Sequence, residues 1–152
     1  MSGLEQIAYD NAIRALDKQE KLVEDLRART GVLLAAASLA VSLLGGRAFA
    51  DDRPVPLVVA ALAALVLAFA GSLLVLMPRA FVFAVAGPPV YERYYGIRDD
   101  PAEIHRRIAY QLHRFWERNE ALFVPVDRAF RVAVWSLVVE ILTLAALASG
   151  IF

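Results

Sequence analysis

Three stretches of this chain are long and apolar enough to cross a lipid bilayer, and they constrain the fold more than any other feature. They cover residues 31–49, 57–78 and 132–152. A transmembrane helix needs about 20 mostly apolar residues to cross a hydrocarbon core of roughly 30 Å. Because unpaired backbone groups are too costly in lipid, each stretch is expected to be a helix. The sequence therefore predicts an all-α membrane protein with three transmembrane helices and cytoplasmic helical extensions.

The composition agrees with this prediction and excludes several functional classes. Hydrophobic residues make up 59% of the chain and the mean hydropathy is +0.54, whereas roughly half of an ordinary soluble domain is apolar. The absence of cysteine excludes disulfides and thiolate chemistry. A formal net charge of zero gives no argument for nucleic acid, and no organised set of stacking aromatics suggests RNA.

Basic residues predict the orientation of the spans. Of the 16 Lys and Arg residues, only Arg47 and Arg53 flank or occupy the predicted external loop at 50–56, while the others lie in 1–30 or 79–131. The positive-inside rule places both of these segments in the cytoplasm and the C-terminus on the periplasmic or extracellular side. The excess of Arg over Lys, with abundant Ala, is typical of a GC-rich bacterial genome, so we expect a bacterial inner membrane. A signal-peptidase site at "AFA" is the alternative, but a signal peptide would not begin with such a long charged segment.

Two cytoplasmic segments are predicted to form helices that approach the membrane. Residues 1–30 form a stalk with a narrow apolar stripe that contains Gln19, and it is expected to continue directly into the first span. A second, amphipathic helix is predicted at 100–124, where Asp100 can cap and Glu103 completes a capping-box pattern. Pro125 should kink or break this helix just before the third span.

The segment that follows the second span is less regular. "AFVFAVAGPP" follows Pro78 and is expected to be an interfacial or partly buried piece. Tyr91, Tyr94 and Tyr95 come next, and they are interpreted as headgroup anchors or, alternatively, as the lining of a ligand site.

The sequence predicts no catalytic, metal or cofactor site. His105 and His113 are eight residues apart, whereas a helical metal pair needs a spacing of three or four. Neither a phosphate-binding glycine loop nor a nucleophile elbow occurs. A basic face on the amphipathic helix is a candidate contact for anionic lipid or a phosphorylated ligand, or else a solvated face that carries the positive-inside signal; its members are Arg106, Arg107, Arg114 and Arg118.

Glu140 lies near the middle of the third span, where a charged side chain costs a few kcal/mol. Three arrangements remain open: the acid carries a proton, it faces a water-lined path, or it forms a hydrogen bond that joins two helices. The candidate intramembrane polar partners are Ser38, Ser42, Ser72 and Thr143.

Small residues on the second span are expected to pack helices closely. Ala60, Ala64 and Ala68 recur every four residues and continue to Ser72. Close approach of backbones associates helices in lipid. Since three short spans enclose little interior, a homo-oligomer is expected, although such a ladder also serves packing within one copy.

Two segments carry a resemblance to known proteins. "LVEDLRARTGVLLAAASLAVSLLGG" and "ERNEALFVPVDRAFRVAVWSLVVEIL" resemble parts of small bacterial multi-span membrane proteins of unknown function. More distantly, the layout is similar to that of SLATT and Pycsar-type transmembrane effectors of nucleotide-activated antiphage defence. The resemblance covers roughly half of the chain and implies a protein that assembles in the inner membrane and breaches it when signalled.

Three functional hypotheses follow. The first is a non-enzymatic, oligomeric inner-membrane effector that permeabilises the membrane. The second is a membrane anchor or assembly scaffold that docks a soluble cytoplasmic partner through its helices. The third is a small proton-coupled transporter that uses Glu140, although no inverted repeat is visible.

Overall fold

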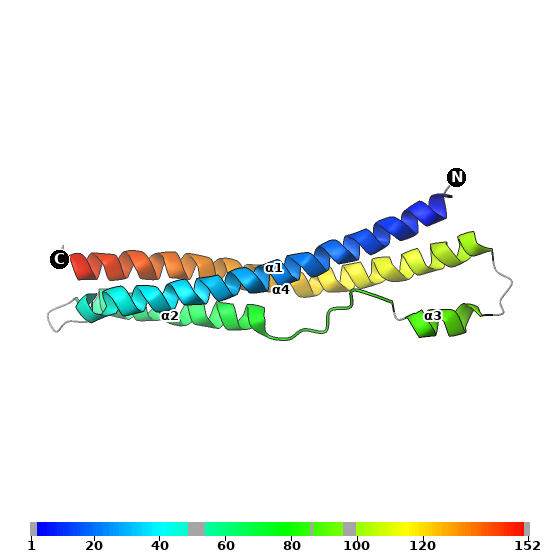
Figure 1. The fold of residues 1–152 in the computed structure, drawn as a ribbon. Helices are drawn as coiled ribbons and strands as arrows, with labels where there is room; N and C mark the ends of the chain where they lie inside the picture. The colour runs from blue at the N-terminus through cyan, green and yellow to red at the C-terminus, as the bar shows by residue number, and fades with distance from the viewer. Residues whose placement is uncertain (1–2, 49–53, 86, 96–99, 151–152) are drawn as a thin grey trace. The chain divides into compact units, whose positions relative to one another are not determined.

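The chain folds entirely into helices and irregular segments in the residues that the structure describes. A computed structural model describes residues 3–48, 54–85, 87–95 and 100–150. These residues form four helices and no strand (Figure 1), namely α1 (Leu4–Ala48), α2 (Val55–Leu76), α3 (Gly87–Tyr94) and α4 (Pro101–Ser149). The predicted all-α fold is confirmed for this part of the chain. Most of the predicted external loop, the end of the third span and the side chains of Arg47 and Tyr91 lie outside the described residues.

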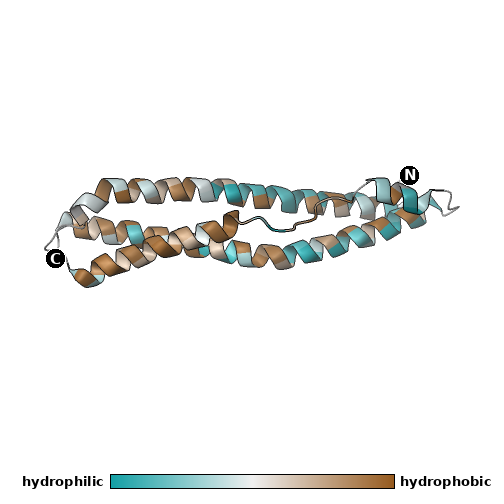
Figure 2. Cartoon of the chain, turned by 90° about the horizontal axis from the view of Figure 1, so that it is seen from below, coloured by the Kyte–Doolittle hydropathy of each residue, from teal (hydrophilic) through white to brown (hydrophobic). Residues whose placement is uncertain are grey.

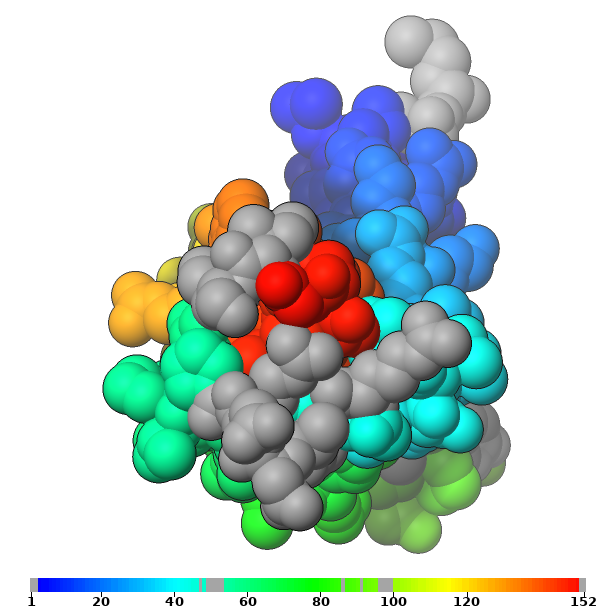
Figure 3. Space-filling model, turned by 90° about the vertical axis from the view of Figure 1, so that its left-hand side faces the viewer, coloured from blue at the N-terminus to red at the C-terminus, as the bar shows by residue number. Residues whose placement is uncertain are grey.

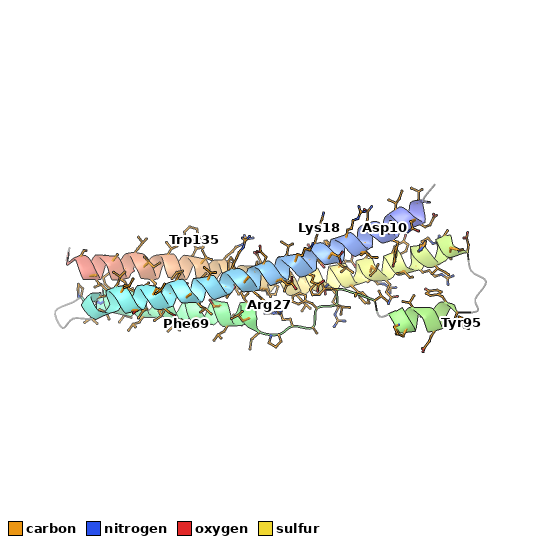
Figure 4. All side chains as sticks on the ribbon, in the orientation of Figure 1. Asp10, Lys18, Arg27, Phe69, Tyr95 and Trp135 are labelled. Atoms are coloured by element: carbon orange, nitrogen blue, oxygen red, sulfur yellow. The ribbon has the colours of Figure 1, made fainter. Side chains whose placement is uncertain are left out.

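Three of these helices, α1, α2 and α4, are long and apolar enough to cross a membrane, as the sequence predicted. The most apolar windows of α1, α2 and α4 are only 22%, 33% and 28% buried, so most of their apolar surface is uncovered. Figure 2 shows that apolar residues occupy almost the whole of α2. Phe69 and Trp135 point away from the neighbouring helices (Figure 4), and Trp135 is 70% exposed. Length and composition therefore indicate a membrane location.

The chain divides into two compact units, and α1 and α4 contribute to both. Unit 1 contains Met1–Glu24 and Arg79–Val124, and unit 2 contains Asp25–Pro78 and Pro125–Phe152. Each unit has its own apolar core.

Unit 2 packs the second halves of α1 and α4 against α2. One of its cores is formed by Ala48, Ala61, Leu144 and Leu147. Figure 3 shows the last turns of α4 (red) beside the end of α1 (cyan) and the start of α2 (green). Alanines at two of the four core positions allow the helices to approach closely, which is how helices associate in lipid.

Unit 1 packs the first halves of α1 and α4 around larger side chains. Its core contains Leu16, Ile108 and Leu112, and Val85 and Tyr94 pack against it. These two come from the segment before α3 and from α3 itself, so both are part of the unit rather than a separate appendage.

Helix α4 begins where the sequence predicted but not with the predicted capping box. The Asp100 Oδ1 accepts a hydrogen bond from the Ala102 N–H at 3.2 Å, which satisfies one free donor of the first turn. The Glu103 carboxylate instead accepts hydrogen bonds from the side chains of Arg106 and Arg107. The capping-box prediction for Glu103 is therefore wrong, because charged partners on the next turn outcompete a backbone amide.

Pro125 lies inside α4 and does not end it. Proline removes one backbone donor and crowds the preceding turn. Val126, directly after it, is 2% exposed, and Ala133 is fully buried, so packing holds the helix beyond the proline. The sequence predicted that Pro125 would either kink or break the helix, and the continuous α4 excludes a break.

Candidate functional site

Glu140 is the most unusual polar residue of unit 2. Its side chain belongs to α4, is 1% exposed, and makes no hydrogen bond with either carboxyl oxygen in the described part of the chain. Burying a carboxylate without a partner costs several kcal/mol, and even a neutral polar group costs energy when it is left unpaired. A single copy of the chain therefore leaves this group unsatisfied.

Three of the four hydroxyl groups predicted as partners of Glu140 donate hydrogen bonds to backbone carbonyls instead. Ser38 donates to the Leu34 carbonyl at 2.9 Å, Ser72 to the Ala68 carbonyl at 2.7 Å, and Thr143 to the Val139 carbonyl at 2.7 Å. Each of these bonds stays within its own helix, a common arrangement for Ser and Thr in helices. Ser42 is exposed. The predicted helix-joining hydrogen bond to Glu140 is thus absent from the described residues.

Glu140 lies on the buried stripe of α4. The stripe continues in steps of three or four residues and consists of Ala133, Ser136, Glu140, Leu144 and Leu147. Ser136 is 8% exposed and lies one helical turn before Glu140. Ser136 was not among the predicted polar partners, although its spacing of four residues from Glu140 places both on one face of the helix.

The backbones of α2 and α4 approach closely at Gly71. A β-carbon placed on Gly71 would lie 2.8 Å from the Ala129 carbonyl oxygen and 3.0 Å from the Ala133 β-carbon. Toward the other end of α2, Ala61 packs with Leu144 and Leu147. These two contacts define an antiparallel register in which the turn from Ala64 to Ala68 is level with Glu140. Glu140 therefore lies at the same height in the bundle as the small residues Ala64 and Ala68 of α2.

The predicted alanine ladder is displaced by one position at its start. Ala64 and Ala68 are buried as expected, but Ala60 is exposed and Ala61 is buried in its place. A strict spacing of four residues drifts around a helix that has 3.6 residues per turn, so the buried side of α2 includes Ala61. Ala60 is therefore uncovered in a single copy, and its role in packing between copies stays a prediction.

The basic face of α4 divides into separate groups. Arg106 pairs with Glu103 at 2.8 Å and lines a groove between α1 and α4. Arg107, which also contacts Glu103 at 2.8 Å, lines a different cleft together with Arg114 and with Arg93 of α3. Arg118 is exposed and lines neither. Arg93 was not predicted as part of this basic face, because only the placement of α3 brings it beside α4.

These ion pairs act on the Glu103 carboxyl group. Its hydrogen bond to Arg107 is the largest influence and lowers its pKa below the ordinary value of 4.5, opposed by partial desolvation and assisted by Arg106. At neutral pH the first two turns of α4 therefore present a carboxylate that neutralises part of the arginine charge.

Asn119 holds the extended segment after α2 within unit 1. It is 1% exposed. Its Oδ1 accepts a hydrogen bond from the Val82 N–H at 3.0 Å, and its Nδ2 donates to the Val82 carbonyl at 2.8 Å. The same Nδ2 lies 3.4 Å from the Gln19 Oε1, and the Gln19 Nε2 donates to the Trp116 carbonyl at 3.2 Å. The "AFVFAV" piece is therefore fixed by specific hydrogen bonds.

The histidines take part in aromatic contacts. His105 lies 5.2 Å from the Tyr9 ring and His113 stacks at 5.9 Å on the Trp116 ring, measured between centroids. Within the described ranges, no group of three or more His, Cys, Asp and Glu residues is arranged to hold a metal ion.

The comparisons with known proteins give no relative from which a function could be transferred. No model of a protein family, no curated protein and no solved structure matches this chain.

Proposed function

We propose that this chain is a non-enzymatic protein of the bacterial inner membrane that assembles into oligomers and permeabilises the membrane. Its N-terminus and unit 1 lie in the cytoplasm, and its C-terminus faces the periplasm. The resemblance to SLATT and Pycsar-type effectors supports a role in antiphage defence, in which a signal triggers the opening.

One observation carries the proposal, namely the burial of Glu140 without a hydrogen-bond partner among the described residues. Within a membrane, polar groups that lack a partner in one helix bundle find one in a neighbouring helix or in a water-filled path. Because Glu140 is buried within one copy, its carboxyl oxygens gain a partner from a second copy, or from water between copies, only when the helices of one copy separate. The small residues Ala64 and Ala68 let backbones approach closely, so a helix of a second copy can pack there in place of a helix of the same copy.

Leakage from liposomes tests this proposal. Purified protein is reconstituted into vesicles that contain a fluorescent dye, and dye release is compared for the wild type, Glu140→Leu and Ala64→Leu. Both substitutions are expected to reduce release at least roughly tenfold, since one removes the polar group and the other overfills the small-residue face. Leu142→Ala is the matched control, because Leu142 is 65% exposed two residues from Glu140 and should retain wild-type release.

Chemical cross-linking in the same vesicles gives the oligomeric state. Wild-type protein should form oligomers that Glu140→Leu weakens. If wild-type vesicles stay sealed at every protein-to-lipid ratio and in the presence of lysate from phage-infected cells, the permeabilisation proposal is wrong.

A second candidate, an anchor or assembly scaffold, is favoured by a groove in unit 1. The groove has a volume of about 520 Å³ and lies between the first halves of α1 and α4. Small side chains, including Ala8, Ala12 and Ala109, line it, and Tyr110 stands exposed at its side. Such a surface suits a helix of a soluble protein. Specific capture of one soluble protein by the wild type but not by Ala12→Gln, without dye release, would favour this role.

The proton-transport hypothesis has less support. A proton relay needs a series of titratable groups. In the described part of unit 2, the other carboxylates are Asp25 and Asp127, and each is paired with an arginine one turn later at 2.7 Å. Glu140 therefore has no second acid with which to exchange a proton.

A further inference from the structure

A cleft in unit 1 gathers three arginines from two helices. It lies between α3 and α4 and has a volume of about 310 Å³, near the lower end of the range of ligand pockets, which is about 300–1,000 Å³. Its lining residues are Arg93, Tyr94, Arg107, Gln111 and Arg114. Each of these side chains carries a polar group, and none of the described residues that line the cleft is a carboxylate.

Two of the three arginines in this cleft have no acidic partner among the described residues. Arg107 contacts Glu103, which lies outside the lining. Neither Arg93 nor Arg114 forms an ion pair or side-chain hydrogen bond with the residues that the structure describes. Arginines that are brought together without a matching set of acids repel one another, so a bound anion would stabilise this arrangement.

The chemistry of the lining selects the class of anion. A guanidinium group presents paired N–H donors that match the oxygens of a phosphate group, and several such groups around one cleft can contact it from different sides. Gln111 adds an amide donor, and Tyr94 adds a phenolic hydroxyl. A phosphate group with two negative charges fits this set better than a single carboxylate.

The rest of the basic face serves as an internal comparison. Arg106 and Arg118 lie on the same helix and carry the same charge, but they do not line this cleft. General attraction to anions would use all of these arginines, whereas a binding site would use only those in the cleft.

We infer that the cleft formed by Arg93, Arg107 and Arg114 binds a phosphate group, supplied either by a lipid headgroup or by a soluble phosphorylated molecule. The inference goes beyond the proposed function and does not depend on it, because a phosphate site in unit 1 is equally compatible with a scaffold.

Binding measurements on the full-length protein in nanodiscs test the inference. In the first arm, nanodiscs of phosphatidylcholine are titrated with inorganic pyrophosphate at fixed ionic strength by isothermal titration calorimetry. In the second arm, no soluble probe is added, and phosphatidic acid retained by the protein after extraction from mixed nanodiscs is counted by native mass spectrometry. Binding in the first arm identifies a soluble source, and retention in the second arm identifies a lipid source. Either result supports the site.

The variants separate the cleft from general charge. Arg93→Gln with Arg114→Gln should weaken binding by roughly tenfold or more, since each charged hydrogen bond contributes a substantial part of the affinity. The control, Arg106→Gln with Arg118→Gln, removes the same charge and should change binding less than about twofold. Circular dichroism and gel filtration establish that each variant is folded. If the glutamine pair does not fold, Arg93→Lys with Arg114→Lys keeps the charge, loses the paired donors and should bind with intermediate affinity.

Two results would overturn the inference. One is equal weakening in the cleft pair and the control pair, which would show delocalised attraction. The other is no binding by the wild type in either arm. Neither result bears on dye release, so a failure here is distinguishable from a failure of the permeabilisation proposal.

Discussion

Asn119 in unit 1 and Glu140 in unit 2 are both 1% exposed, but they differ in whether their polar atoms have hydrogen-bond partners. Asn119 exchanges two hydrogen bonds with the backbone of Val82 and reaches Gln19 as well. Glu140 has no hydrogen-bond partner within the described residues. A buried polar group that is satisfied specifies the fold of one copy, whereas one left unpaired costs that fold free energy.

The two units also differ in the side chains that pack their helices together. The core of unit 1 contains large side chains such as Leu16 and Leu112, together with a polar network. In unit 2, small residues bring the helices together, and much of the large apolar surface is uncovered. The two units thus differ in the size of their core side chains and in how their buried polar groups are paired.

The largest expected effect comes from breaking the polar network of unit 1. Asn119→Leu preserves approximate size but leaves the Val82 N–H and carbonyl unpaired, which should cost on the order of 3 kcal/mol. Hydrogen exchange of the Val82 amide should then be about 100-fold faster. The exposed neighbour Arg118→Leu is the control and should leave this amide protected. Unchanged protection in Asn119→Leu would show that the network does not hold the segment.

A smaller effect, confined to unit 2, is expected from a pair of glycine substitutions. Gly71→Ala forces a β-carbon against the Ala129 carbonyl, so it should destabilise the bundle by about 2 kcal/mol. Gly31→Ala meets no atom within 4 Å and should instead stabilise α1 by about 0.5 to 1 kcal/mol. The two shifts are measured as changes of opposite sign in thermal stability in nanodiscs. A stabilising Gly71→Ala would contradict the close approach of α2 and α4.

The smallest effect concerns the acid at the start of α4. Because Arg107 and Arg106 lower the pKa of Glu103, its ion pairs stabilise the folded state above the ordinary value of 4.5. That contribution is lost as the pH falls through the lowered pKa of the folded state. Carbon-detected NMR of Glu103 should give a midpoint below 4.5, and Glu103→Gln should remove this part of the acid dependence of unit 1. A midpoint at or above 4.5 would contradict the pairing.

The length of the apolar stretches predicted the helical class and the number of apolar helices, because the cost of unpaired backbone in lipid leaves few alternatives. The extended segment at Val82 could not be predicted in this way. It depends on Asn119, 37 residues later, and a lone Asn in a helical stripe carries no signal of its partner. The start of α4 was predictable from Asp100 and Pro101, since capping is a local interaction.

The candidate sites were predicted only in part, for a similar reason. A charge in an apolar run is visible in the sequence, so Glu140 was selected directly. Whether its oxygens are paired depends on how three helices meet, and a spacing pattern does not contain that information. The arginine cleft required Arg93, which reaches Arg107 and Arg114 only through the placement of α3.

Accessibility of single cysteines tests the central claim most directly, namely that unit 2 crosses the lipid and unit 1 lies in the cytoplasm. The chain contains no cysteine, so each substitution introduces a unique thiol. Lys18→Cys, Val55→Cys and Leu67→Cys are treated with a membrane-impermeant maleimide in spheroplasts and in inverted vesicles. The account predicts that Lys18→Cys reacts only in inverted vesicles, Val55→Cys only in spheroplasts, and Leu67→Cys in neither until the membrane is dissolved. Reaction of Lys18→Cys in sealed spheroplasts, or rapid reaction of Leu67→Cys in either preparation, would contradict it.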